Sequence, residues 1–251
     1  MEASRRDGGG AAAAAHRIGV LMKVHIWSDI VCPWCYVGKR QFERALADFE
    51  HADEVEIVWR SYELDPRAPE VREGTYAERI ARKYGIEVGQ ARAAMSRIIS
   101  VGAEAGIDFK FEIMRPGNTF DAHRLVHLGA AHDLAGVVKQ RFLHATFFEG
   151  APIGQREVLQ RLAVEAGLDA DEVAAVLASD RFADDVRADE RVAQSMGITG
   201  VPFFLIDDAY GVPGAQEPAV FLNLLRRAWG ETYRAAEDVA GEACADEVCD
   251  L

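Results

Sequence analysis

Apolar and polar positions change their period twice between Met22 and Tyr62. Residues 24–27 form a strand-like apolar run, and residues 54–62 largely alternate between polar and apolar side chains, which is typical of a strand with one buried face. Between them, apolar side chains recur at the spacings of three, four and seven residues that mark one helix face (Phe42, Ala45, Leu46 and Phe49). The pattern predicts a strand, a helix and a second strand in this order.

A helical period then dominates residues 75–196, where short apolar faces separated by glycines and polar turns predict seven helices. Strand character returns at residues 201–206. The dipeptide Asp207-Asp208 predicts a turn, after which residues 209–212 can pair back as a hairpin. A last apolar face, on residues 220–228, predicts a closing helix.

This order of elements predicts an α/β domain that carries a large, all-helical insertion. We place the first part of the domain at residues 22–65, the insertion at 66–190 and the second part at 191–230. Residues 1–21 contain short glycine and alanine runs, and we expect a disordered leader there rather than a signal peptide, because the alanine run is short and weakly apolar. We expect residues 231–251 to form a flexible tail.

Composition excludes several classes of partner. The chain has 251 residues, of which 49% are hydrophobic, and a formal net charge of −13. Nucleic acids and anionic membranes attract basic surfaces, so neither is expected as a partner, and no apolar run approaches the length of a membrane span. With no secretory signal predicted, we expect a cytoplasmic protein, in which four cysteines indicate catalysis or metal binding rather than structural disulfides.

Two of these cysteines stand where the first predicted helix begins, in Cys32-Pro33-Trp34-Cys35. Counting back seven residues from Phe42 reaches Cys35, so we expect Cys35 on the buried face and Cys32 exposed at the first turn. A helix N-terminus favours a thiolate at Cys32, and Cys35 is near enough to resolve a mixed disulfide formed there. Pro33 suits a first helical turn, and Trp34 offers apolar surface to an unfolded chain. The motif predicts a dithiol that acts on protein thiols and disulfides.

A zinc site is the alternative for the cysteines, because the C-x-x-C spacing also occurs in such sites. Cys32 and Cys35 could share one ion with Cys244 and Cys249 if the tail folded back. We favour redox chemistry, since the first pair opens a helix and the second lies on a predicted flexible tail. We therefore expect no bound metal and no cofactor.

Other polar residues are weaker candidates for catalysis or metal binding than the cysteines. His123 and His127 stand four residues apart on a predicted helix, but the first is not followed by the glutamate of a zinc protease motif, so we favour a packing role. Asp29 could shuttle protons, tune the thiol or form the turn before Cys32. His25 fits a position within the sheet better than a catalytic base.

Three stretches of the chain resemble the DsbA branch of the thioredoxin superfamily, and most closely its FrnE-like cytoplasmic oxidoreductases. These are residues 28–38 (SDIVCPWCYVG), 118–124 (NTFDAHR) and 197–204 (GITGVPFF). The resemblance spans about residues 22–229 and implies a thioredoxin-like fold with a helical insertion. It also implies a cis bond before Pro202 that lies against the cysteine pair, with Pro202 limiting access to the thiols and Val201 pairing with a substrate strand.

The resemblance further implies a role for the tail cysteines. FrnE-like proteins, which this chain resembles, carry a C-terminal pair of cysteines with the spacing of Cys244 and Cys249. The resemblance suggests that the pair is an auxiliary redox dithiol. Asp246, Glu247 and Asp250 surround this pair and would disfavour a thiolate. A passive tail is the other interpretation.

Two further functions stay open at this stage. The chain also resembles kappa-type glutathione transferases and 2-hydroxychromene-2-carboxylate isomerases, which bind glutathione and typically use a serine near the position of Cys32. Both cysteines are present here, which favours a disulfide isomerase or reductase whose partners are protein thiols or disulfides, with glutathione or a thioredoxin-type protein as candidate reductants. A redox-inert binding or chaperone module is the third possibility.

Overall fold

The computed structural model describes residues 21–232. The predicted leader up to residue 20 and the tail from residue 233, with Cys244 and Cys249, lie outside this range. The elements, in chain order, are β1 (Met22–Ser28), α1 (Pro33–Ala47), a 3-10 turn (Ala52–Glu54), β2 (Val55–Ser61), α2 (Tyr76–Tyr84), α3 (Val88–Glu104), α4 (Phe120–Ala130), α5 (Ala135–His144), a π-helical turn (Ala145–Glu149), α6 (Arg156–Glu165), α7 (Ala170–Leu177), α8 (Ala183–Ser195), β3 (Phe203–Ile206), β4 (Tyr210–Pro213) and α9 (Pro218–Thr232). The predicted order of strands and helices is confirmed.

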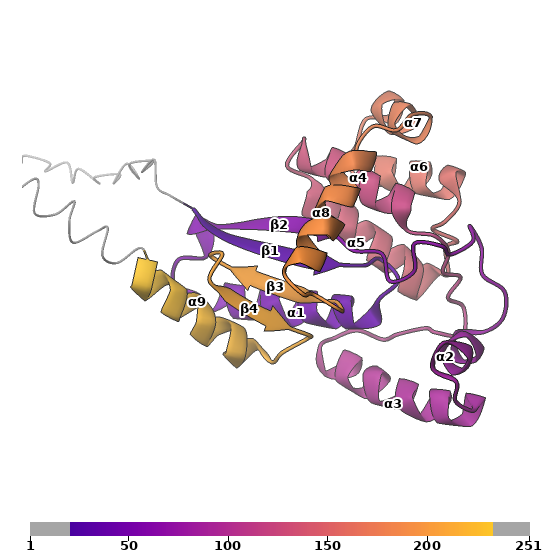
Figure 1. Ribbon diagram of the computed structural model, residues 1–251, viewed down its shortest axis with the longest axis horizontal. Helices are drawn as coiled ribbons and strands as arrows, with labels where there is room; N and C mark the ends of the chain where they lie inside the picture. The colour runs from indigo at the N-terminus through magenta and orange to yellow at the C-terminus, as the bar shows by residue number, and fades with distance from the viewer. Residues whose placement is uncertain (1–20, 233–251) are drawn as a thin grey trace, which may run out of the picture.

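The four strands form one sheet in the order β2-β1-β3-β4. β1 runs parallel to β2 and antiparallel to β3, which pairs with β4 as a hairpin. Asp207 and Asp208 adopt positive φ angles of 51° and 54° in the three-residue turn between the paired residues Ile206 and Tyr210. The sheet therefore joins the two ends of the described chain, while the helices α2 to α8 arise from the long connection between β2 and β3 (Figure 1).

Side chains alternate along each strand, so each strand contributes to both faces of the sheet. Both faces are covered by other elements. Val24 and Ile26 of β1 point to the face on which α1 and α9 pack, where Phe42 stacks on Phe204 at a ring-centroid distance of 5.5 Å. Trp27 points to the opposite face, where it packs with residues of α8 and of the segment before β3. β1 is thus buried on both sides and holds the turn that follows it in a fixed place.

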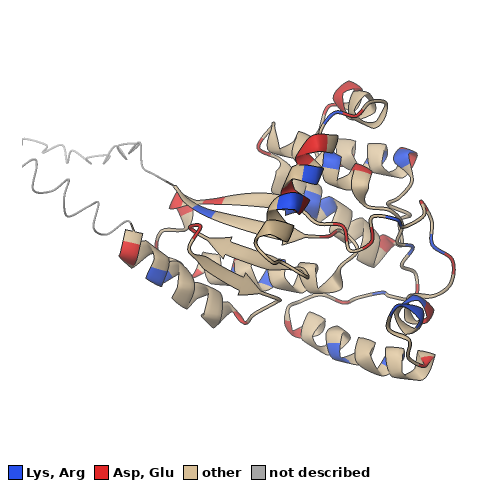
Figure 2. Cartoon of the chain, viewed as in Figure 1, with Lys and Arg blue, Asp and Glu red and all other residues tan. Residues whose placement is uncertain are grey.

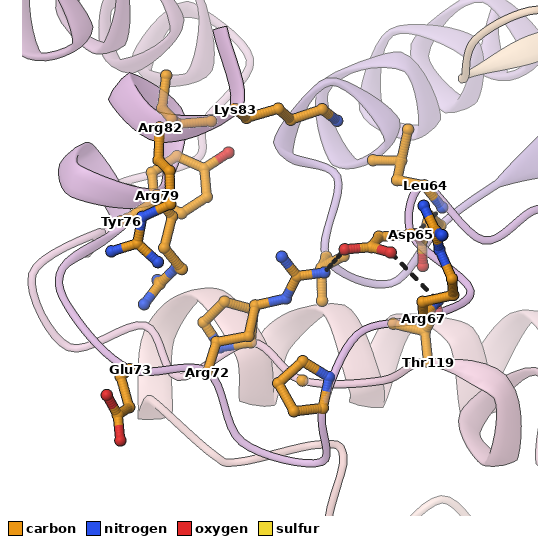
Figure 3. A pocket seen from close by; sticks show the side chains of 16 residues that line it. Leu64, Asp65, Arg67, Arg72, Glu73, Tyr76, Arg79, Arg82, Lys83 and Thr119 are labelled. Carbon is orange, nitrogen blue, oxygen red and sulfur yellow. Dashed lines mark hydrogen bonds and ion pairs between the residues drawn. The ribbon is translucent and has the colours of Figure 1, made fainter. Parts of the chain in front are cut away.

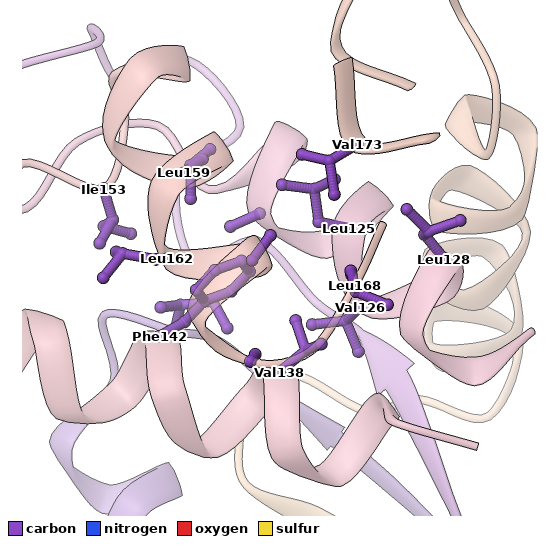
Figure 4. Close-up of a cluster of buried hydrophobic side chains, with 14 of the residues drawn as sticks. Leu125, Val126, Leu128, Val138, Phe142, Ile153, Leu159, Leu162, Leu168 and Val173 are labelled. Carbon is purple, nitrogen blue, oxygen red and sulfur yellow. The ribbon is translucent and has the colours of Figure 1, made fainter. Parts of the chain in front are cut away.

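The helical segment has its own core, formed mainly by α4, α5, α6 and α7 (Figure 4). Ile30, in the turn before Cys32, belongs to this core and is fully buried. A second cluster joins Tyr36 and Val37 of α1 to α3, to Leu143 of α5 and to Phe147. The start of α1 therefore lies between the sheet and the helical segment, with both packed against it.

Some predicted boundaries differ from the observed ones. The strand expected at residues 201–206 begins at Phe203, because Pro202 has no N–H to donate to a sheet. Gly102, one of the glycines expected to separate predicted helices, instead lies within α3, where a Cβ atom would be 2.6 Å from the ring of Phe109. The domain boundaries at residues 65 and 190 stay predictions. None of the helices described between residues 21 and 232 is long and apolar enough to traverse a bilayer.

Candidate active site

Cys32 is the N-cap of α1, and Pro33 occupies the first helical position, as predicted from their order. The N–H of Cys35 donates to the carbonyl of Cys32 across 3.1 Å, which closes the first turn. Both cysteines are free thiols. The motif thus places two sulfurs at the N-terminal end of a helix, where unpaired backbone N–H groups favour negative charge.

The Val201–Pro202 peptide bond is cis, as the family resemblance implied, and it lies against the cysteine motif. The Sγ of Cys32 donates to the carbonyl of Val201 across 3.6 Å. Gly38 makes this approach possible, since a Cβ at position 38 would lie 2.8 Å from the Cγ of Pro202. Gly38 stands within one of the resembling stretches, yet only the packing of α1 on Pro202 explains why a side chain is excluded there.

The expected exposure of the two thiols is corrected by the structure. We expected Cys32 to face solvent and Cys35 to be buried, but the exposed fractions are 5% and 2%. The prediction for Cys32 was wrong because the Val201 segment, which is distant in sequence, lies over its sulfur. Among the predicted substrate-binding residues, Pro33 is buried, whereas Trp34 and Val201 are half-buried and offer surface beside the thiol.

The resolving thiol is held in its protonated form. Burial raises the pKa of Cys35 well above its usual range, and Cys32 raises it further through its hydrogen bond and, once ionised, through its negative charge. The N–H of Asp29, 3.4 Å from the Cys35 sulfur, and the charge of Lys139 act in the opposite direction. Loss of the negative charge on Cys32 would therefore make Cys35 easier to ionise.

Asp29 connects the cysteine turn to two other elements. Its Oδ2 accepts from the N–H of Leu64 at 2.8 Å, and its Oδ1 lies 3.4 Å from Nε2 of His123 on α4. Burial by itself would raise the pKa of Asp29, but the hydrogen bonds from His123 and Leu64 and the charge of Lys139 hold it below its usual range. Burial lowers the pKa of His123, so a neutral imidazole donates to the ionised carboxylate. His123 is buried, as a packing role requires, and its imidazole also makes a polar contact with Asp29.

Lys139 of α5 is a buried cation that the sequence did not single out. Its Nζ donates to the carbonyl of Ser28 across 3.1 Å and lies 5.7 Å from the ring centroid of Trp59. Burial lowers the pKa of Lys139 to about 8, although Asp29 and the sulfurs of Cys35 and Cys32, whenever either is ionised, favour its protonated form. The helical period of α5 does not indicate burial of a lysine, so only the docking of α5 beneath the turn reveals this contact.

The other two histidines considered as candidate functional residues contact side chains other than the two cysteines. Nε2 of His127 is 3.1 Å from Oδ2 of Asp189, and the side chain of His25 lies between Arg60 and Asp208. Among the residues that the structure describes, no group of three or more His, Cys, Asp or Glu side chains is arranged to hold a metal ion. The zinc alternative needs Cys244 and Cys249, which lie outside those residues.

Known proteins match this chain over most of its length. A family model described as DSBA-like thioredoxin domain matches residues 23–226. The crystal structure of a probable DsbA oxidoreductase from Streptomyces coelicolor shares 46% identity and a TM-score of 0.79, covering 84% of this chain and 91% of that one. YwbO of Bacillus subtilis is 29% identical over 205 residues, which is 80% of this chain and 94% of YwbO.

A more distant structure shares the fold. The cytosolic disulfide reductase DsbM from Pseudomonas aeruginosa, solved with GSH, has a TM-score of 0.55 at 14% identity, covering 86% of this chain and 99% of DsbM. The predicted fold class, a thioredoxin-like fold with a helical insertion, is confirmed. The predicted recognition of the DsbA family is confirmed as well. The chain belongs to the family of DSBA-like thioredoxin domains, and it is an enzyme of the thiol–disulfide oxidoreductase class.

Proposed function

We propose that this protein is a cytoplasmic, FrnE-like disulfide reductase or isomerase that acts on protein substrates through Cys32 and Cys35. The observation that carries the proposal is the pair of free thiols at the start of α1, with the carbonyl of Val201 3.6 Å from the Cys32 sulfur. A substrate sulfur that approached Cys32 would lie beside the half-buried Val201 and Trp34. These two residues and Pro202 are proposed to position the substrate chain, with buried Pro33 shaping the turn beneath it.

The reaction is a two-step exchange. The Cys32 thiolate attacks one sulfur of a substrate disulfide, the substrate S–S bond breaks, and the released substrate thiolate takes up a proton. Forming this mixed disulfide removes the charge and the hydrogen bond that raised the pKa of Cys35. Cys35 then loses its proton and attacks the Cys32 sulfur, which frees the second substrate thiol and leaves an enzyme disulfide. Glutathione or a thioredoxin-type protein dithiol is proposed to return the two electrons.

Trapping of the mixed disulfide tests this assignment. Both variants are made in a Cys244→Ser/Cys249→Ser background, so that the tail cysteines cannot react. With a disulfide-bonded peptide, Cys35→Ser should accumulate a covalent adduct at Cys32 that intact mass spectrometry detects, whereas Cys32→Ser should form none. Reduction of insulin should fall by at least about a hundredfold in both variants, since each lacks one of the two required sulfurs. An adduct on Cys32→Ser, or full reductase activity in Cys35→Ser, would refute the assigned roles.

The tail pair is proposed to exchange disulfides with Cys32 and Cys35 as an auxiliary dithiol. Comparing the full chain with Cys244→Ser/Cys249→Ser in insulin reduction and in refolding of a scrambled protein tests this step. We expect slower turnover in the variant, and equal rates in both assays would refute the proposal. Elemental analysis of the purified full chain addresses the zinc alternative, because stoichiometric zinc held by all four thiols would exclude the redox role.

A glutathione-dependent isomerase or transferase is the alternative function, and the second cysteine distinguishes the two. A single nucleophile suffices for glutathione addition, so such an activity would survive Cys35→Ser. Dithiol exchange would not. Client protection that is equal in wild type and in Cys32→Ser/Cys35→Ser would instead favour a redox-inert chaperone.

A further inference from the structure

A cavity of about 520 Å³ opens beside the cysteine turn, between α2 and the segments that follow β2 and precede α4 (Figure 3). Val31, the residue before Cys32, lines it, and so does Tyr76 of α2. Val31, Tyr76 and Trp34 also pack against one hydrophobic cluster. The cavity is therefore adjacent to the surface from which a partner would reach Cys32.

The lining of this cavity is positively charged, although the whole chain is strongly acidic. Five basic side chains line it (Arg67, Arg72, Arg79, Arg82 and Lys83), together with three carboxylates (Asp29, Asp65 and Glu73). Two positive charges remain in excess, in a chain of net charge −13. Figure 2 shows basic residues on α2 and on the segment leading to it.

Most of these cations are not neutralised within the protein. Arg72 pairs with Asp65 at 2.5 Å, and Arg79 donates to the backbone carbonyls of Gly74 and Met114. For Arg67, Arg82 and Lys83, residues 21–232 provide no salt-bridge partner, and all three are exposed. Figure 3 shows Arg67 on one wall of the open space and the α2 cations on the other.

The wall that carries Arg67 and Arg72 is fixed by backbone contacts. The N–H of Arg72 donates to the carbonyl of Pro116 at 3.2 Å, and the N–H of Asn118 donates to that of Pro69 at 2.9 Å. Gly117 allows the carbonyl of Glu70 to come so close that a Cβ would be 1.8 Å from its oxygen. The opposite wall, α2, begins with a complete capping box. The cavity is therefore formed before any ligand binds.

We propose that this cavity binds carboxylate side chains of protein substrates that flank the cysteine reacting with Cys32, so that the enzyme prefers acidic polypeptide segments. This rests on the proposed function and adds the class of substrate. Guanidinium groups bind carboxylates through paired hydrogen bonds, and opposite charge speeds association. Five cations on two walls suit a segment with several carboxylates better than glutathione, which has two carboxylates and an ammonium group.

Two peptides of equal length test the proposal. Each contains one disulfide, which is flanked by Asp and Glu in the first and by Asn and Gln in the second. Rates of oxidation of the reduced full-length protein, followed by intact mass, should favour the acidic peptide by about tenfold at low salt. The preference should shrink in 0.5 M salt, because screening weakens attraction between exposed charges.

Variants assign this preference to the cavity. In Arg82→Glu/Lys83→Glu the ratio of the acidic to the neutral rate should fall at least about fivefold, and Arg82→Gln/Lys83→Gln should give a smaller decrease in the same direction. The matched control Arg97→Glu/Arg191→Glu changes the net charge equally at exposed positions outside the cavity and should keep the wild-type ratio. Circular dichroism checks that each variant is folded.

The outcomes separate this proposal from the function on which it rests. Equal wild-type rates on both peptides, or equal losses of preference in the cavity and control variants, overturn the role of the cavity only. A cavity variant that keeps its peptide preference but loses reaction with glutathione disulfide assigns the cavity to glutathione and also overturns the proposal. A wild-type protein that reacts with neither peptide refutes the proposed function itself.

Discussion

The sulfur of Cys32 lies 3.6 Å from the carbonyl oxygen of Val201, a residue 169 positions further along the chain. This contact requires the start of α1 to pack directly on the Val201–Pro202 segment. Gly38 permits that packing, since no side chain separates α1 from Pro202 at this position. The cysteine motif and the cis-proline segment therefore form one site, because α1, which begins at the cysteine motif, packs directly on that segment.

Gly38→Ala should lower the reductase activity proportionally more than it lowers the stability of the fold. The added methyl group would lie 2.8 Å from the Cγ of Pro202 and 3.3 Å from the Phe204 ring, so the Pro202 segment must move away from Cys32. We expect insulin reduction to fall by about tenfold, because displacements near 1 Å in a reactive site are costly. Overpacking should lower the free energy of unfolding by about 1–3 kcal/mol in urea titrations.

Gly89→Ala is the matched control for that substitution. Gly89 lies in the first turn of α3, and a Cβ there meets no atom within 4 Å. Alanine should leave reduction unchanged and stabilise the helix by up to about 1 kcal/mol. Wild-type activity in Gly38→Ala would show that the close approach of α1 to Pro202 is not needed for catalysis.

Lys139→Met should slow the resolving step. The positive charge of Lys139 lowers the pKa of Cys35, in opposition to burial, so its removal should raise that pKa further. The mixed disulfide at Cys32 should then decay about tenfold more slowly at neutral pH, and its decay rate should reach its maximum at a higher pH. Acid quenching and intact mass, repeated across pH 6 to 10, measure both quantities.

Lys110→Met controls for the loss of a lysine, since Lys110 is exposed and its charge is not among the main influences on the pKa of Cys35. It should keep the wild-type pH profile. A profile in Lys139→Met that matches the wild type, with only a lower midpoint of unfolding, would show that Lys139 has a purely structural role.

Glu63→Gln should change how stability depends on pH. Burial, which outweighs the 2.5 Å ion pair with Arg187, raises the pKa of Glu63 from 4.5 to about 7. A group whose pKa is raised on folding stabilises the protein fully below its unfolded pKa, and this contribution is lost as pH rises through the folded value. The wild type should therefore lose stability relative to Glu63→Gln between pH 5 and 8, on the order of 5 °C in melting temperature.

Glu217→Gln, at an exposed position, is the control and should follow the wild-type curve. Thermal melts at one-unit pH intervals supply the comparison. If the difference in melting temperature between wild type and Glu63→Gln stayed constant from pH 5 to 8, the carboxyl group of Glu63 would not titrate in that range.

Asp189→Ala should destabilise the attachment of α8 to the sheet. The buried carboxylate accepts from the N–H of Ser61 at 2.8 Å and from Arg60 at 3.0 Å, and it lies 3.1 Å from His127. Alanine leaves these donors without their acceptor, which should cost about 3 kcal/mol in urea unfolding. The exposed Asp185→Ala on the same helix should cost about 0.5 kcal/mol, and similar losses in both variants would contradict the anchoring role.

The elements of this fold were predictable because they depend on short-range patterns. The apolar face from Phe42 to Phe49 indicated α1, and the dipeptide Asp207-Asp208 indicated the hairpin, since each signal lies within a few residues of the element that it describes. The position of Cys32 at the start of a helix followed from the same kind of pattern. Local periodicity thus determined the order of strands and helices and the place of the cysteine pair in that order.

Tertiary structure decided what surrounds the two thiols. The burial of Cys32 depends on Val201, the charge near Cys35 depends on Lys139, and the exclusion of a side chain at Gly38 depends on Pro202. Each contact joins residues that are more than 100 positions apart, and no periodic signal records which distant segments pack together. Electrostatic and steric effects act through space, so the sequence alone determined where the cysteine pair stands, while the packing of the helical segment on the sheet determined which other groups surround the two thiols.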